Sequence, residues 1–204
     1  MVYPVNEIFY SLQGEGFHAG RAAVFIRLAG CNLECPWCDT DHTARICYTA
    51  EEIIGVIAYM ESTIIEAPSF VVLTGGEPTI HPLEELLTKL KEFGVSLIAI
   101  ETNGTNTKAL EEYKKKKLLD WITISPKSLS TVATSNLEVA DEIKIVWDEK
   151  NPPSIYEVFI DSILNKGRAY IQPCSQDYKP AVDFVLNNPR WRLSVQTQKI
   201  IGVR

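Results

Sequence analysis

The segment Gly30-Cys-Asn-Leu-Glu-Cys-Pro-Trp-Cys-Asp-Thr40 places three cysteines within eight residues. The spacing Cys-x3-Cys-x2-Cys lets one loop wrap three thiolates around a single metal centre, whereas an iron–sulfur cube usually takes four cysteines. Three thiolates leave one iron open to a small molecule, much as a catalytic zinc keeps one open position. The segment therefore predicts a reactive metal centre held by Cys31, Cys35 and Cys38.

Two other interpretations of this loop stay open at this point. A structural zinc of the Cys3His type could take His42, which follows Cys38 by four residues. Inert buried thiols are less favoured because the residues around the three cysteines are polar. The two remaining cysteines, Cys47 and Cys174, have no cysteine nearby and are expected to be ordinary free thiols.

Apolar, β-branched runs alternate with amphipathic segments on the carboxyl side of this loop, which is the pattern of βα units. The expected strands are Ala22 to Leu28, Phe70 to Thr74, Val95 to Glu101, Trp121 to Ser125, Glu142 to Trp147, Ala169 to Gln172 and Arg192 to Gln196. The expected helices start at the capping box Thr49-Ala-Glu-Glu52 and at Pro82, and span Thr107 to Lys117, Ser154 to Asn165 and Lys179 to Leu186. Because such crossovers are right-handed, the α/β pattern predicts a partial barrel or a doubly wound sheet.

Chemistry-bearing residues follow these strands at their carboxyl ends. Besides the cysteine loop, the segments are Gly75-Gly-Glu-Pro78, Thr102-Asn-Gly104, Pro126-Lys127 and Pro173-Cys-Ser175. In both architectures the carboxyl ends of parallel strands meet at one rim. We therefore expect these loops to form one site.

Composition limits the class of protein. The chain has 204 residues, of which 46% are hydrophobic, so we expect one folded domain over residues 1–204. The formal net charge of −6 argues against a protein that coats nucleic acid or an anionic membrane, and favours a small-molecule substrate. The first residues lack a secretion signal and the cysteines are few and odd in number, so we expect a cytoplasmic protein.

The cysteine loop, with Trp37 before its last cysteine, and Gly75-Gly-Glu-Pro78 after a strand together resemble the motifs of radical S-adenosylmethionine (SAM) enzymes. The resemblance implies a 4Fe-4S cluster on Cys31, Cys35 and Cys38, with SAM at the open iron. It also implies an α/β fold, a partial (β/α) barrel of about six mainly parallel strands. In such enzymes SAM yields a 5′-deoxyadenosyl radical, and the protein positions and shields the reactants.

Further motifs resemble the 7-carboxy-7-deazaguanine synthases within that superfamily. They are Asn6 to Gly16, Phe25-Ile-Arg-Leu-Ala-Gly-Cys31, Trp37-Cys-Asp-Thr40, Ser125-Pro-Lys127, Gln172-Pro173 and Gln196 to Gly202. The resemblance implies a Mg²⁺-dependent carbon–nitrogen lyase that converts 6-carboxy-5,6,7,8-tetrahydropterin to 7-carboxy-7-deazaguanine with loss of ammonia. This step belongs to the biosynthesis of queuosine, a tRNA modification. It further implies a homodimer and a flavodoxin-type reductase as electron donor.

The resemblance assigns site residues where the motifs match, and no side chain is assigned as a catalytic acid or base. The residues implied for SAM are Trp37, Cys38, Asp39, Gly76, Glu77, Ser125, Pro126, Lys127, Gln172, Pro173, Cys174 and Ser175. Those implied for the substrate are Leu12, Gln13, Gly14, Glu15, Arg27, Thr74, Gln198 and Arg204, with Thr40 on Mg²⁺.

These assignments are chemically reasonable. The planar guanidinium of Arg27 suits bidentate binding of a carboxylate. The carboxylate of Glu15 can accept hydrogen bonds from the aminopyrimidine edge of a pterin. Magnesium prefers oxygen ligands and keeps waters, so the Thr40 hydroxyl and substrate oxygens would serve.

One position departs from the family pattern. The chain reads Gln196-Thr-Gln-Lys199 where members of the family carry Gln-Thr-His-Lys, so Gln198 replaces a histidine. An amide donates and accepts hydrogen bonds but lacks the ionisable proton of imidazole. We expect the orientation of the substrate, or its pH dependence, to differ accordingly.

Two alternative functions remain. An enzyme that installs a glycyl radical on a partner protein shares the small size, the cysteine spacing and the aromatic residue. The segments Leu12 to Gly16 and Ser125 to Lys127, together with Arg27, favour a compact anionic substrate instead. A non-catalytic zinc-binding interaction module is the alternative from another class.

Overall fold

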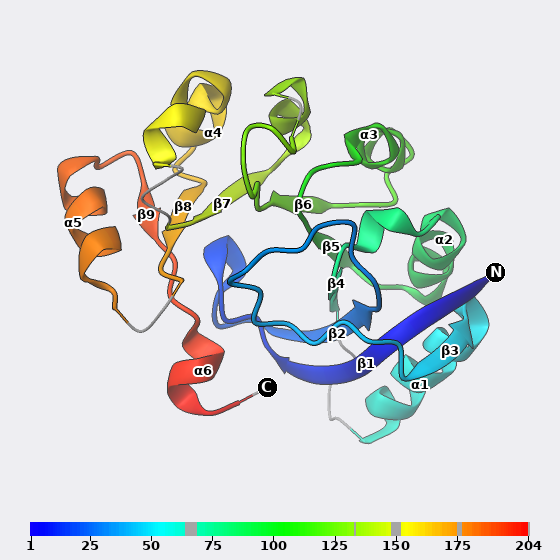
Figure 1. The fold of residues 1–204 in the computed structure, drawn as a ribbon. Coiled ribbons are helices and arrows are strands. Elements are labelled where there is room, and N and C mark those ends of the chain that lie inside the picture. The colour runs from blue at the N-terminus through cyan, green and yellow to red at the C-terminus, as the bar shows by residue number, and fades with distance from the viewer. Residues whose placement is uncertain (64–68, 133, 148–151, 175–176, 204) are drawn as a thin grey trace.

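The computed structural model describes residues 1–63, 69–132, 134–147, 152–174 and 177–203, which form a nine-stranded sheet with helices outside it (Figure 1). The strands are β1 (Val2–Leu12), β2 (Ala22–Leu28), β3 (Ile46–Thr49), β4 (Phe70–Gly75), β5 (Leu97–Thr102), β6 (Trp121–Ile124), β7 (Glu142–Val146), β8 (Ala169–Gln172) and β9 (Arg192–Leu193). Their spatial order is β3-β1-β2-β4-β5-β6-β7-β8-β9. The sheet is curved and does not close, because β3 and β9 each pair on one side only.

The mainly parallel α/β architecture expected from the sequence is confirmed. β2 and the strands β4 to β9 pair in parallel, whereas β1 is antiparallel to both β2 and β3. The strands β1 and β3 had not been predicted. Pro4 lies within β1, opposite Cys47 of β3. A proline argues against a strand when the sequence alone is considered, because it cannot donate a backbone hydrogen bond.

The helices are α1 (Ala50–Thr63), α2 (Glu84–Phe93), α3 (Thr107–Lys115), α4 (Asp161–Asn165), α5 (Lys179–Asn187) and α6 (Thr197–Ile201), with short 3₁₀ turns η1 (Gly16–His18), η2 (Pro78–Ile80), η3 (Thr134–Val139) and η4 (Pro153–Phe159). Four of the helices, α2 to α5, lie between strands of the parallel part of the sheet, while α1 follows β3 and α6 follows β9. The capping box before α1 is present, because the backbone N–H of Thr49 donates to Glu52 at 2.7 Å and that of Glu52 donates to Thr49 at 3.2 Å. Gly94 ends α2 in the left-handed conformation, with φ of 99°.

One expected helix, Ser154 to Asn165, is wrong as a continuous element. The chain forms η4, breaks at Ile160 and continues as the five-residue α4. The segment carries β-branched residues such as Ile155 and Val158, which lower helix propensity. The helical spacing of Ile53, Ile57, Met60 and Ile64 predicts an apolar stripe on α1, of which Ile64 lies outside the described residues.

Alternation along the strands separates two apolar layers. Val24, Ile26 and Leu28 of β2 face the helices and join the large cluster between sheet and helices, while Ala23 and Phe25 face the concave side. The same alternation holds in β4 to β7. Polar residues at the concave positions of these strands therefore point into the interior of the partial barrel.

The amino ends of the strands are closed by a plug built from η1. Trp121 and Phe70 begin β6 and β4, and the ring of His18 lies 4.6 Å from that of Trp121 and 5.1 Å from that of Phe70. Burial and the charges of Arg21 and Arg168 lower the pKa of His18 to about 4, so this imidazole is neutral near pH 7. The opposite rim is the accessible one.

The C-terminal segment lies beside the open side of the barrel, between β1 and β9 (Figure 1). The backbone N–H of Thr197 donates to the carbonyl of Gly14 at 3.1 Å, and that of Gly16 donates to the hydroxyl of Ser194 at 3.1 Å. These bonds join the segment after β1 to the segment after β9. In the described part of the chain, no helix has the length and hydropathy to span a membrane.

Candidate active site

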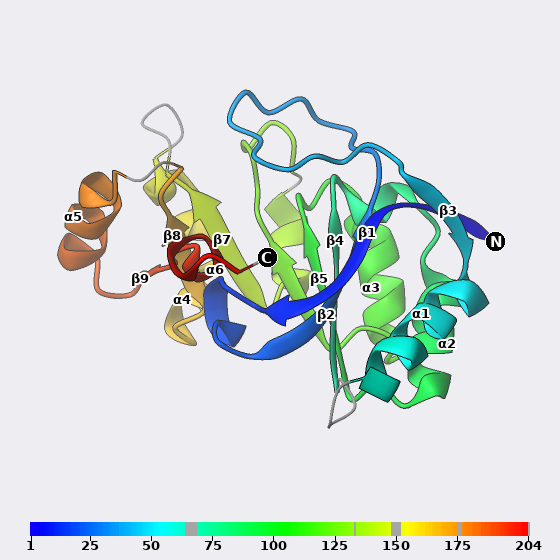
Figure 2. The ribbon, with the colours of Figure 1, turned by 90° about the horizontal axis from the view of Figure 1, so that it is seen from below.

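A cavity of about 970 Å³ lies at the carboxyl ends of the strands, beneath the loop between β2 and β3. Figure 2 shows this loop, in light blue, along one rim of the sheet. Side chains from β1, β2, β4, β5, β7 and β8, from the cysteine loop and from the C-terminal segment line the cavity. The cavity thus brings together segments from the first strand to the C-terminal helix, and the loops after the parallel strands meet there because those strands end at the same rim.

Most residues assigned from the sequence lie on this cavity. The lining includes Leu12, Gln13, Gly14, Glu15, Arg27, Thr74, Gln198, Cys31, Cys35, Cys38, Trp37, Asp39, Thr40, Gly76, Ser125, Lys127, Gln172, Pro173 and Cys174. Glu77 and Pro126 are described but do not line it, and Ser175 and Arg204 lie outside the described residues.

Two backbone hydrogen bonds fix the conformation of the cysteine loop. Gly30 has a φ of 87° and its N–H donates to the carbonyl of His42 at 2.9 Å, which closes the base of the loop. Within the loop, the N–H of Cys38 donates to the carbonyl of Cys35 at 3.0 Å. Cys31 and Cys35 are half-buried and Cys38 is exposed, and all are free thiols at the cavity.

Gly75, which ends β4, and Gly76 bring a second loop against the cysteine loop. The N–H of Gly76 donates to the carbonyl of Leu28 at 3.2 Å. A Cβ on Gly76 would lie 2.0 Å from the carbonyl oxygen of Gly30 and 2.9 Å from the Cβ of Cys31. Only glycine fits at position 76, because its backbone lies against that of Gly30 and Cys31, the first of the three cysteines.

Glu77 lies outside the cavity lining, and its assignment to the SAM pocket stays a prediction. Its carboxylate is fully buried and accepts hydrogen bonds from the N–H and hydroxyl of Thr79, at 3.0 and 2.6 Å. It also accepts from the hydroxyl of Thr102 and the N–H of Asn103, each at 2.6 Å. The carboxylate thus joins the loops after β4 and β5, and it has no oxygen left facing the cavity.

The donor set fits an iron–sulfur cube. Three soft thiols from one loop face the same cavity, and thiolates are the ligands that iron–sulfur clusters take. Among the described residues, no three His, Cys, Asp or Glu side chains converge closely enough for a single metal ion.

Arg27 and Thr74 lie side by side on the inner face, because β2 and β4 pair with these two residues in register. The Nε–H of Arg27 donates to the carboxylate of Glu7 at 3.0 Å, and the guanidinium lies 5.8 Å from the ring centre of Phe9. Both contacts orient the guanidinium within the cavity lining. A cation held this way can bind a carboxylate.

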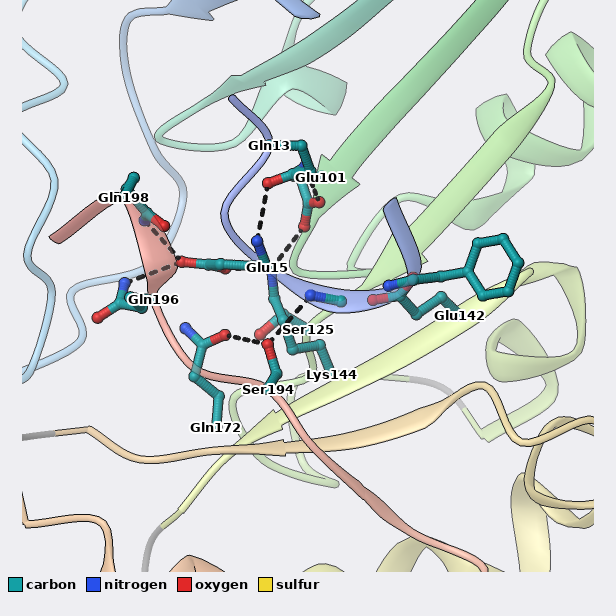
Figure 3. Close-up of polar contacts among 12 residues, drawn as sticks. Gln13, Glu15, Glu101, Ser125, Glu142, Lys144, Gln172, Ser194, Gln196 and Gln198 are labelled. Carbon is teal, nitrogen blue, oxygen red and sulfur yellow. Dashed lines mark hydrogen bonds and ion pairs between the residues drawn. The ribbon is translucent and has the colours of Figure 1, made fainter. Parts of the chain in front are cut away.

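A buried ion cluster lies deeper in the cavity and was not expected from the sequence (Figure 3). The ammonium of Lys144 on β7 donates to Glu15 at 2.5 Å and to Glu101 at 2.9 Å, and only 7% of the lysine side chain is exposed. The amides of Gln196 and Gln198 donate to the second oxygen of Glu15 at 2.9 and 3.3 Å. Burial opposes ionisation of Glu15, but Lys144 and these amides outweigh it, so the pKa of Glu15 lies below its usual value.

The sequence did contain a signal for Lys144. In Glu142–Val146 the apolar Ile143 and Ile145 join the outer cluster, so Glu142 and Lys144 must point inward. Charged residues on the inner face of a buried parallel strand need partners or a ligand. Glu101 follows the same rule, since it alternates with the outward-facing Ile98 and Ile100 on β5.

The cysteine loop is also connected to the C-terminal helix. The ammonium of Lys199 and the amide of Gln196 donate to Asp39 at 2.5 and 3.2 Å. The hydroxyl of Thr40 donates to the other oxygen of Asp39 at 3.4 Å. The helix α6 thus contacts the same loop that carries the thiols, at the mouth of the cavity.

Comparisons with known proteins agree with this geometry. The family model of the radical SAM superfamily matches residues 25–149. The 7-carboxy-7-deazaguanine synthase of Bacteroides thetaiotaomicron is 42% identical to this chain, with full coverage of both proteins, and that of Haemophilus influenzae is 38% identical, over 98% of this chain and 94% of the relative. The crystal structure of QueE from Escherichia coli superposes with a TM-score of 0.71 at 30% identity, covering 97% of this chain and 95% of that one.

Proposed function

Because this chain belongs to the 7-carboxy-7-deazaguanine synthases of the radical SAM superfamily, we propose that it converts 6-carboxy-5,6,7,8-tetrahydropterin to 7-carboxy-7-deazaguanine with release of ammonia. This reaction serves queuosine biosynthesis, and residues 1–204 act as one catalytic domain. The observation that carries the proposal is one cavity with three thiols at its mouth and Arg27, Thr74 and Glu15 along its wall.

The cofactor end of the cavity is formed by the cysteine loop and the loops after β4, β6 and β8. Cys31, Cys35 and Cys38 would hold the 4Fe-4S cluster. When bound, the cluster and SAM supply a carbon radical that removes a hydrogen atom from the substrate. The buried walls keep water from this radical, which is the contribution of the apolar concave face.

The polar groups of SAM would meet the loops after β6 and β8. The ammonium of Lys127 donates to the hydroxyl of Ser125 at 3.0 Å, and both residues line the cavity. Burial and the nearby Lys144 ammonium lower the pKa of Lys127, so this side chain would gain from an anionic partner. We propose that Ser125 and Lys127 bind polar groups of SAM, with Gln172 and Pro173 along the same wall.

The substrate end of the cavity offers complementary groups at opposite sides. Arg27 would bind the carboxylate of the substrate, and the acceptors of Glu15 would bind the N–H groups of the pterin edge. Thr40 would place its hydroxyl on a Mg²⁺ shared with the substrate. Gln198, which donates to Glu15, lies where family members carry a histidine, and it would orient the carboxylate without titrating near neutral pH.

The resemblance to the family also supports proposals about partners. A flavodoxin-type reductase would supply the electron, and two chains would form a homodimer. The five cysteines are free thiols, which supports a reducing compartment such as the cytoplasm.

The experiment that tests the function is turnover by anaerobically reconstituted protein. We expect SAM, Mg²⁺, a reductant and 6-carboxytetrahydropterin to give 7-carboxy-7-deazaguanine, detected by mass, with SAM cleavage stimulated by the pterin. SAM cleavage without any response to the pterin would favour a glycyl-radical activating enzyme. A colourless protein with zinc and no iron would favour the zinc-binding module.

A further inference from the structure

Lys144 is the centre of a charged cluster to which neither the motifs nor the comparisons assign a role. Its ammonium bridges Glu15, which follows β1, and Glu101, at the end of β5 (Figure 3). Gln13 donates to the other oxygen of Glu101 at 3.3 Å. The three charged side chains line the cavity, so the bridge is part of the site and not of the outer core.

A purely structural role does not account for this cluster. Below it, the concave face is packed by apolar side chains such as Phe25, Val72 and Trp121. Burying an ion pair costs desolvation, and well-packed apolar residues of similar volume stabilise a fold as well or better. The buried charges therefore point to a ligand that needs them.

The hydrogen-bonding capacity of the two carboxylates leaves room for such a ligand. An ionised carboxylate has about four acceptor positions. Glu15 accepts from Lys144, Gln196 and Gln198, and Glu101 accepts from Lys144 and Gln13. Each carboxylate thus retains acceptor capacity at the cavity wall.

We propose that Lys144 is a positioning residue for the substrate, which fixes the carboxylates of Glu15 and Glu101 as a pair of acceptors for the N–H groups of the pterin's aminopyrimidine edge. The proposal rests on the function proposed above. Lys144 acts through the two carboxylates, so its removal should change how the substrate binds more than how the cluster forms.

The charge pattern gives the role of Lys144 a distinctive signature. The charged groups around Glu101 are Lys144 on β7, Glu15 after β1, Glu142 at the start of β7 and Lys127 after β6. Burial and the Glu15 charge already hold the pKa of Glu101 above its usual value, and Lys144 opposes this effect. Without Lys144, two neighbouring carboxylates would share a proton, and one acceptor would become a donor.

The test compares the reconstituted wild type with Lys144→Met, Lys144→Arg and a matched control, Lys114→Met. Lys114 also pairs with a carboxylate, Asp141 at 2.8 Å, but lies on α3 outside the cavity lining. The readouts are KM and kcat for 6-carboxytetrahydropterin, and the Kd of the fluorescent analogue 6-carboxypterin, each at pH 6.5, 7.5 and 8.5. Iron content and thermal unfolding report the cluster and the fold.

We expect Lys144→Met to raise the Kd and KM about 30-fold at neutral pH, as loss of charge-assisted acceptors requires. Binding to this variant should tighten as the pH rises, whereas the wild type and Lys114→Met should show little pH dependence. Lys144→Arg should restore most of the affinity, with iron content unchanged throughout. An unchanged Kd in Lys144→Met, or a weakened Kd with no pH dependence, would overturn the proposal.

A second variant, Glu101→Gln, tests the same proposal independently of whether Lys144→Met folds. Glu101→Gln keeps the volume and removes one charge, and we expect it to weaken 6-carboxypterin binding by itself. Because Lys144 acts through Glu101, Lys144→Met should cost less in the Glu101→Gln background than in the wild type. Additive effects would contradict the proposal. If the wild type fails to turn over 6-carboxytetrahydropterin, the proposed function itself is wrong. If the wild type does turn it over and Lys144→Met has the same Kd and KM, only the proposed role of Lys144 is wrong.

Discussion

The backbone N–H of Glu77 donates a hydrogen bond to the carbonyl of Gly30 at 2.9 Å. This bond joins the loop after β4 to the residue immediately before the first cysteine, Cys31. It explains physically why two motifs more than 40 residues apart in the sequence occur together. The loop after β4 supports the cysteine loop through its backbone, and the carboxylate of Glu77 holds that support in place.

Gly76→Ala should disrupt the cysteine loop. The added Cβ would lie 2.0 Å from the Gly30 carbonyl, so one of the two backbones must move. We expect less than half of the wild-type iron content after reconstitution and loss of SAM cleavage. Gly55→Ala on α1 is the control, since nothing lies within 4 Å of its Cβ and alanine should stabilise this helix by about 1 kcal/mol. Full iron loading of Gly76→Ala would contradict the account.

Arg27→Met should raise the KM for the carboxypterin about 100-fold, because a buried charge pair with the substrate carboxylate is lost. The KM of Arg27→Lys should lie between those of the wild type and Arg27→Met, since an ammonium cannot bind a carboxylate in bidentate fashion. Arg190→Met, at an exposed pair with Asp161, is the control. The Kd of an analogue without the carboxylate should be insensitive to Arg27→Met, and an equal loss for both ligands would exclude the assigned contact.

Thr40→Ala should raise the Mg²⁺ concentration needed for half-maximal activity about tenfold, through loss of one oxygen ligand. The measurement is a Mg²⁺ titration at saturating substrate. Thr88→Ala on α2 is the control, because its hydroxyl bonds within its own helix, to the carbonyl of Glu84. An unaltered Mg²⁺ response would remove Thr40 from the metal site.

Glu142→Gln should change the pH dependence of stability. Burial and the charge of Glu101 raise the pKa of Glu142 to about 7, so the folded protein binds this proton more tightly than the unfolded chain does. The stability contributed by that proton is present at low pH and is lost as the pH rises through 7. From pH 6 to pH 8 the free energy of unfolding of the wild type should fall by about 1 kcal/mol relative to that of Glu142→Gln.

Glutamine keeps an acceptor for the N–H of Phe17, which donates to Glu142 at 3.0 Å, so the fold should persist. The check is the free energy of unfolding of the reconstituted protein at both pH values. Parallel pH profiles for the two proteins would show that Glu142 ionises normally.

The sequence was informative where one residue type decides the local structure. The cysteine spacing, the glycine pair after β4 and the alternating strands led to the correct rim and to most of its lining. Arg27 could be placed because it follows the apolar Phe25 on the inner face of a clearly periodic strand. These features depend on neighbours in sequence, which is why they could be recognised.

Other features depend on contacts between distant segments. The strand pattern of β7 indicates that Lys144 points inward, but its partners, Glu15 after β1 and Glu101 on β5, are seen only in the structure. The helix α6 has five residues, too few to show a periodic pattern, yet Gln196 and Lys199 contact the site. Glu77 was assigned to SAM from its motif, whereas its partners on η2 and β5 show a carboxylate used within the protein.

Three thiols at the mouth of the cavity would hold a 4Fe-4S cube whose fourth iron is open to SAM. The most direct measurement is electron–nuclear double resonance on the reduced, reconstituted protein with SAM labelled with ¹⁵N at its amino group. We predict hyperfine coupling between the cluster and this nitrogen. A fully loaded cluster that shows no such coupling, because a side chain already occupies its fourth iron, would contradict the account.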